Sequence, residues 1–130
     1  MSDAGTIKLW HTMSVKDADA MIEWLRAIGF TEHATYRDEA DPTVVHHAEW
    51  IWPGGGGLMF GTHSEESPIS GIGPAAAYLV TDDPDIVFDK AVSAGATVVR
   101  AMVDQDYGGR GGTVQDPEGN SWSFGDYQPG

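Results

Sequence analysis

The sequence contains no cysteine, which excludes disulfide bonds, thiolate metal sites and a cysteine nucleophile. Basic residues are also few: 7 Lys and Arg stand against 20 Asp and Glu, for a formal net charge of −13 at pH 7. Binding to nucleic acid or to an anionic membrane requires clustered basic side chains, so this charge argues against both partners. The acidic excess indicates either a solvated surface that aids solubility or a negative field that attracts cationic ligands.

Long apolar runs are missing as well. No segment approaches the roughly 20 apolar residues that a membrane-spanning helix needs. The first residues, Met-Ser-Asp-Ala-Gly-Thr, lack the basic region and apolar run of a secretion signal. We therefore expect a cytoplasmic protein, and at 130 residues we expect a single domain over residues 1–130.

The most informative stretch spans residues 107–127. Asp116-Pro-Glu-Gly119 predicts a tight turn, because proline presets φ at its second position and glycine tolerates the unusual φ that follows. After the turn, Trp122 and Phe124 alternate with the small residues Ser121, Ser123 and Gly125. This period of two predicts a strand with one apolar face and one polar face, the second of which could contact a ligand.

The remainder of the chain shows the same order of elements twice. In the first copy, over residues 6–62, a strand precedes a helix that Asp17 caps and Gly29 ends, and three strands follow at 32–37, 44–52 and 58–62. In the second copy, over residues 75–127, a strand precedes a helix that begins at Asp83-Pro84 and ends at Gly95. A strand at 97–102 and the hairpin complete it, and residues 63–73 form a linker.

Four consecutive glycines, 54–57, allow two interpretations. A phosphate-binding loop would need a helix N-terminus directly after it, whereas the segment that follows has the pattern of a strand. The glycines therefore predict a hairpin turn.

The combination of Tyr107-Gly-x-Arg110 with Asp116-Pro-Glu-Gly-Asn-x-Trp-Ser-Phe-Gly resembles the closing hairpin of the vicinal oxygen chelate superfamily. That superfamily groups glyoxalases, bleomycin-type resistance proteins and extradiol dioxygenases, and the bleomycin-resistance branch is the most similar. The resemblance implies an α+β fold of paired β-α-β-β-β modules, with a curved eight-stranded mixed sheet around a ligand cleft and helices on its outer face. It also implies a homodimer.

The resemblance further bears on metal binding. Metal-using members place His or Glu ligands on the first and last strands of each module, and the matching positions here hold Trp10, Met59, Ala76 and Ser123. These side chains are poor ligands for a divalent ion, so we expect no cofactor. A displaced site of His11, His47 and Glu49 is the alternative, although strand alternation places His11 against the helix.

Aromatic and charged residues suggest how a ligand could bind. Trp24, Trp50 and Trp122 share faces with apolar neighbours and are expected in the core. Trp10 and Tyr78 alternate onto the cleft face, where they either stack on a planar ligand or fill the cavity. Arg110 either clamps a ligand oxygen or pairs with a carboxylate such as Asp106.

We therefore predict a small-molecule-binding protein that sequesters an aromatic or cationic compound without metal and without catalytic residues, as in antibiotic resistance. The alternative is a metal-dependent lyase, isomerase or dioxygenase of the glyoxalase type, and a third possibility is a partner-binding module. The predicted ligand contacts are Trp10, His47, Glu49, Met59, Tyr78, Tyr107, Arg110 and Ser123.

Overall fold

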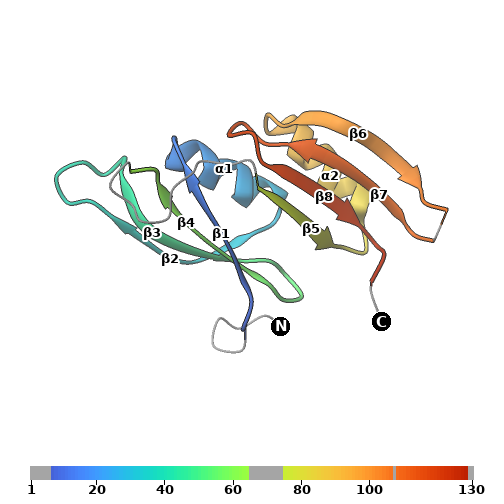
Figure 1. The fold of residues 1–130 in the computed structure, drawn as a ribbon, viewed down its shortest axis with the longest axis horizontal. Helices are drawn as coiled ribbons and strands as arrows, with labels where there is room; N and C mark the ends of the chain where they lie inside the picture. The colour runs from blue at the N-terminus through green and yellow to red at the C-terminus, as the bar shows by residue number, and fades with distance from the viewer. Residues whose placement is uncertain (1–6, 65–74, 107, 129–130) are drawn as a thin grey trace. The chain divides into compact units, whose positions relative to one another are not determined.

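The computed structural model describes residues 7–64, 75–106 and 108–128 (Figure 1). The chain divides into two compact units, Met1–Gly73 and Pro74–Gly130.

The first unit contains four strands and one helix in the predicted β-α-β-β-β order (Figure 1). The elements are β1 (Trp10–Val15), α1 (Ala18–Ile28), β2 (Thr31–Arg37), β3 (Val45–Ile51) and β4 (Gly57–Thr62). Its sheet has the order β1-β4-β3-β2, with β1 and β4 parallel and the other neighbours antiparallel.

The second unit repeats this arrangement. Its elements are β5 (Ala76–Val80), α2 (Pro84–Ser93), β6 (Thr97–Asp104), β7 (Arg110–Gln115) and β8 (Ser121–Gly125). The sheet order β5-β8-β7-β6 matches that of the first unit strand for strand, again with a parallel first pair. The internal repeat and the α+β class are confirmed, and the strands lie in two four-stranded mixed sheets. The curved sheet around a cleft remains an expectation.

The helix boundaries follow from the capping residues identified in the sequence. The Asp17 side chain accepts a hydrogen bond from the backbone N–H of Ala20 at 3.1 Å, and Gly29 ends α1 with a φ of 119°. Pro84 opens α2, but the side chain of Asp83 makes no capping hydrogen bond there. Gly95 follows α2 with a φ of 116°.

The glycine-rich segment between β3 and β4 is a hairpin turn, as predicted. Gly54, Gly55 and Gly56 all have positive φ, which other residues rarely adopt. The N–H of Trp52 donates to the carbonyl of Gly56 at 3.0 Å and closes the turn.

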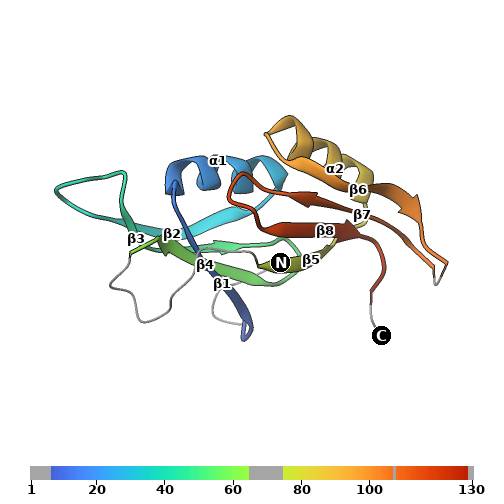
Figure 2. The ribbon, with the colours of Figure 1, turned by 45° about the horizontal axis from the view of Figure 1, so that its top comes forward.

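Each helix lies on one face of the sheet of its own unit (Figure 2). Trp24 on α1 and Trp50 on β3 are fully buried in the first core, and Trp122 on β8 is fully buried in the second, which confirms all three as core residues. We call the other side of each sheet, away from its helix, the open face. Among the described residues, neither helix is long and apolar enough to cross a membrane.

Strands β2 and β6, each at one edge of its own sheet, carry two register shifts each. In β2, Glu32 pairs with Trp50 and Ala34 with Glu49, so His33 is an extra residue in a β-bulge. Bulges in edge strands discourage pairing with the edge of another sheet. The bulge in β2 also positions a side chain of the candidate site.

Candidate functional site

Four of the predicted ligand contacts share the open face of the first sheet. Residues that are directly paired across neighbouring strands present their side chains on the same face. Met59 on β4 pairs with Glu49 on β3, and His47 lies two residues from Glu49 on the same strand. Trp10 on β1 pairs with Gly57, two residues before Met59. Their sequence neighbours Trp50, Leu58 and Phe60 are buried on the opposite side of the sheet.

Trp10 rests against the neighbouring strand at Gly57. A Cβ atom built at Gly57 would collide with the indole carbons Cε3, Cδ2 and Cζ3 of Trp10. Gly57 has no positive φ, so the conformation of the backbone does not require glycine at this position. The absence of a side chain instead lets the indole lie against β4, where it is half-buried on the open face.

Polar side chains on β2 and β3 form a cluster around Glu49. The Nε2 atom of His47 lies 2.8 Å from Oε2 of Glu49, and Nε2 of His33 lies 3.8 Å from Oε1 of the same carboxylate. The Tyr36 ring stacks on the His47 imidazole with centroids 6.3 Å apart. His33 was not among the predicted ligand contacts, because the bulge that turns its side chain toward Glu49 leaves no local signal in the sequence.

The alternative metal-ligand set of His11, His47 and Glu49 is wrong for this fold. His11 pairs with Leu58, which is buried on the α1 side, so His11 and Glu49 lie on opposite faces of the sheet. Burial of the imidazole lowers the pKa of His11, as expected for a partly buried core histidine. Within the described parts of the chain, no group of three or more His, Asp or Glu residues is arranged to hold a metal ion.

The open face of the second sheet carries a row of side chains that crosses all four strands. Tyr78 pairs with Ser123, Ser123 with Thr113, and Thr113 with Arg100. The hydroxyls of Thr113 and Ser123 are 2.7 Å apart, and the Tyr78 hydroxyl donates to the carbonyl of Tyr127 at 2.9 Å. Tyr78 and Ser123 therefore share a face, as the sequence predicted. Arg100 was not among the predicted residues, because two register shifts in β6 obscure its alternation.

Arg110 lies on the other side of this sheet. Its Nε donates to Asp85 at the start of α2 at 2.8 Å, and its Nη1 donates to Asp104 at 3.4 Å. The hydrogen bond to Asp85 is the main cause of a raised pKa for the Arg110 guanidinium. Pairing with a carboxylate was one of the two sequence-based expectations, but the partners are Asp85 and Asp104 rather than Asp106. Tyr107 is outside the described residues.

The carboxylate of Asp116 holds the closing hairpin together. It accepts hydrogen bonds from the backbone N–H of Glu118 at 2.8 Å, the backbone N–H of Asn120 at 3.0 Å and the indole Nε1 of Trp122 at 2.7 Å. The side-chain amide of Asn120 also donates to it, and Asn120 in turn accepts a hydrogen bond from the N–H of Ala75. The motif from Asp116 to Trp122 is therefore structural, since its polar atoms bond to one another.

Comparison with known proteins identifies the family of this chain. The family model of the glyoxalase/bleomycin resistance protein/dioxygenase superfamily matches residues 8–124. The chain belongs to this superfamily. The paired modules of the fold agree with that assignment, and the closing hairpin that suggested it lies inside the matched region.

Solved structures extend the similarity over nearly the whole chain. TioX from Micromonospora sp. ML1 is 28% identical, with a TM-score of 0.75 over 92% of this chain and 98% of that one. A bleomycin-binding protein complexed with bleomycin is 18% identical, with a TM-score of 0.63 over 95% of this chain and all of the other. Lactoylglutathione lyase from Agrobacterium tumefaciens is 16% identical, with a TM-score of 0.66 over 95% of each chain. The latter two likenesses show the fold alone.

A curated relative matches a shorter segment. The protein Mb0911c of Mycobacterium bovis is 48% identical over 52 residues, which make up 40% of this chain and 34% of that protein. The match thus spans about a third of the length of the relative.

Proposed function

We propose that the protein binds an aromatic small molecule against the open face of the first sheet and holds it without chemical change. The observation that carries this proposal is the indole of Trp10, which lies against Gly57 and is only half-buried. An aromatic ring held in a fixed position supplies a stacking surface with little conformational entropy to lose on binding.

Charge favours a ligand with cationic character. Glu49 lies on the same face as Trp10, and the whole chain has a net charge of −13. A cation above an indole is also attracted by the electrons of the ring. His47 and Met59 complete the proposed contacts on this sheet. Tyr78 and Ser123 are proposed as ligand contacts of the second sheet, taken by itself.

The donor set supports binding without a metal cofactor. The family positions for metal ligands hold Trp10, Met59, Ala76 and Ser123, which are poor ligands for a divalent ion. Arg110 is omitted from the proposed site because two carboxylates engage its guanidinium on the helix side of the sheet. The superfamily to which the chain belongs includes bleomycin resistance proteins, which supports the proposed class of function, namely sequestration of a compound as a means of antibiotic resistance.

A metal-dependent lyase, isomerase or dioxygenase is the second candidate. The contacts of His33 and His47 with the Glu49 carboxylate favour this function, as does the presence of glyoxalases and dioxygenases in the superfamily. Elemental analysis of the purified protein separates the two functions: one equivalent of zinc, nickel or iron per chain that is lost in Glu49→Ala would support the enzyme.

Titration with acridine orange, a planar aromatic cation, tests the binding proposal through quenching of tryptophan fluorescence. Trp10→Ala should weaken binding by about fivefold or more, which corresponds to about 1 kcal/mol of stacking and cation–π interaction. Added salt should also weaken binding of acridine orange to the wild type, because it screens the acidic residues. Leu9→Ala is the matched control, because Leu9 precedes Trp10 and is 84% exposed. Equal affinities of the Trp10→Ala variant and the wild type would contradict the proposal.

We also propose that the protein is a cytoplasmic homodimer. Sedimentation equilibrium of the purified chain tests the dimer, and a monomer at all concentrations would contradict it.

A further inference from the structure

We propose that the open face of the second sheet, taken by itself, binds the carboxylate group of a small molecule through Arg100, with help from Thr113 and Ser123. This inference goes beyond the proposed function, because it concerns an anionic group and the second unit alone.

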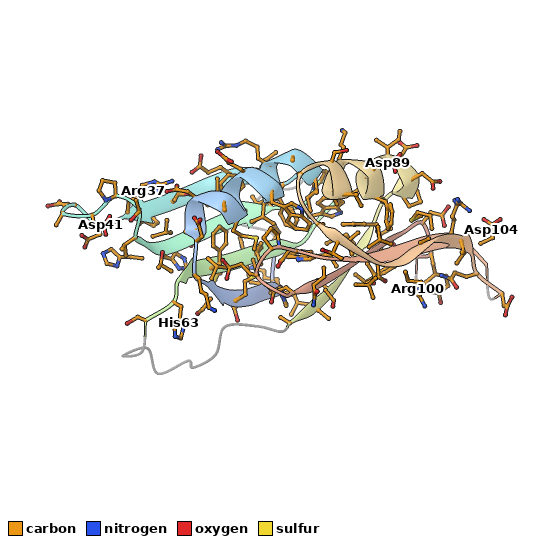
Figure 3. All side chains as sticks on the ribbon, turned by 90° about the horizontal axis from the view of Figure 1, so that it is seen from above. Arg37, Asp41, His63, Asp89, Arg100 and Asp104 are labelled. Atoms are coloured by element: carbon orange, nitrogen blue, oxygen red, sulfur yellow. The ribbon has the colours of Figure 1, made fainter. Side chains whose placement is uncertain are left out.

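The first support is the placement of Arg100 at the end of the cross-strand row. Arg100 on β6 pairs with Thr113 on β7, which pairs with Ser123 on β8. In Figure 3, Arg100 lies on the side of the second sheet away from α2, whereas Asp89 of α2 lies on the other side. Neighbouring strands are separated by about 4.8 Å, so the long side chain of Arg100 can reach above the Thr113 hydroxyl.

The second support is the lack of a carboxylate partner for Arg100. The other three arginines form ion pairs: Arg26 with Glu32, Arg37 with Asp19, and Arg110 with Asp85 and Asp104. Among the residues that the structure describes, Arg100 is in no ion pair, although acidic residues outnumber basic ones by 20 to 7. Among the described residues, Arg100 is therefore the arginine whose guanidinium has no carboxylate partner.

The third support is the composition of the surrounding surface. Apart from Arg100, the strand residues that pair across this face are small, apolar, or carry a hydroxyl or amide group. None of them is acidic. Asp104, the one acidic strand residue of this unit, pairs with Arg110 and is not in these rows. Among the paired strand residues of this face, Arg100 therefore carries the one formal charge.

The hydroxyl pair adds a donor. Thr113 and Ser123 share a single hydrogen bond of 2.7 Å, which uses one of their two hydroxyl protons. The second proton can be donated to an acceptor. A carboxylate would thus meet the two parallel N–H groups of a guanidinium and one O–H group, a combination that suits its planar pair of oxygens.

NMR titration of the full chain with benzoate tests this site, with benzamide as the uncharged analogue and ionic strength held constant. Benzoate should shift the Arg100 Nε–Hε resonance and the amide resonances of Thr113 and Ser123, and benzamide should not. Arg100→Gln should raise the Kd for benzoate by about tenfold or more, as expected for the loss of a charge-assisted hydrogen-bonded pair. Arg37→Gln changes the net charge equally on the first unit and should leave the Kd unchanged.

Three results would overturn the inference: equal responses to benzoate and benzamide, an unchanged Kd in Arg100→Gln, or an equal rise in Arg37→Gln. The test is separable from that of the proposed function, because benzoate binding should persist in Trp10→Ala. If the wild type binds benzoate but does not bind acridine orange, only the proposed function is contradicted. If the wild type binds acridine orange but does not bind benzoate, only the carboxylate site at Arg100 is contradicted.

Discussion

The indole of Trp10 lies so close to Gly57 that the two positions cannot both carry side chains without movement. They come from parallel, hydrogen-bonded strands and are direct partners in the register. Gly57 therefore contributes to the candidate site indirectly, because its lack of a side chain leaves room for the Trp10 ring.

Gly57→Ala should displace the Trp10 ring and destabilise the protein by about 1–2 kcal/mol, as inserted methyl groups do at packed positions. Urea unfolding measures this cost, and the tryptophan emission of the folded variant should shift. In a Trp10→Ala background the same substitution should cost much less, since the clash is gone. Equal costs in the two backgrounds would show that the two residues are not coupled.

Asp116→Ala should destabilise the protein by about 3 kcal/mol or more. The buried side chains of Asn120 and Trp122 would lose their acceptor, and unpaired buried donors are costly. Urea unfolding again measures the change. Asp89→Ala removes the same charge from an exposed position of α2 and should have little effect. A similar loss in both variants would mean that charge, and not the hydrogen-bond network, is responsible.

The repeat offers a matched test of helix capping. Asp17→Ala should cost about 1 kcal/mol, because its side chain accepts the N–H of Ala20. Asp83→Ala at the equivalent position of α2 should cost less than about 0.5 kcal/mol, since the side chain of Asp83 makes no capping bond. Thermal unfolding of both variants checks the difference, and equal losses would contradict the capping assignment.

Protonation of His11 should make the protein less stable in mild acid. Burial lowers the pKa of His11 in the folded state, so the unfolded chain binds more protons once the pH falls below about 6.5. The free energy of unfolding should decrease from about pH 7.5 to about pH 5.5, and less so in His11→Gln. The exposed His33→Gln serves as the control. A pH dependence that His11→Gln leaves intact would assign the effect to other groups.

Much of this fold could be predicted from the sequence because its signals are local. The Asp116–Gly119 turn, the Asp17 cap and the Gly29 terminus each depend on residues within a few positions of one another. Strand alternation also placed His11 on the helix side of β1 and Trp10 on the opposite face, as the register confirms, since side chains alternate with a fixed period of two.

Features that depend on the register between strands were decided only by the tertiary structure. The bulge at His33, the direction of Arg110 toward Asp85 and the row that ends at Arg100 all follow from how distant strands and helices align. One extra residue in a strand moves every later side chain to the opposite face, and the energy that selects the bulge comes from pairing partners far away in the chain. The sequence alone could therefore identify the residues of the open faces only where the strands are regular, and the bulged edge strands that carry His33 and Arg100 required the folded structure.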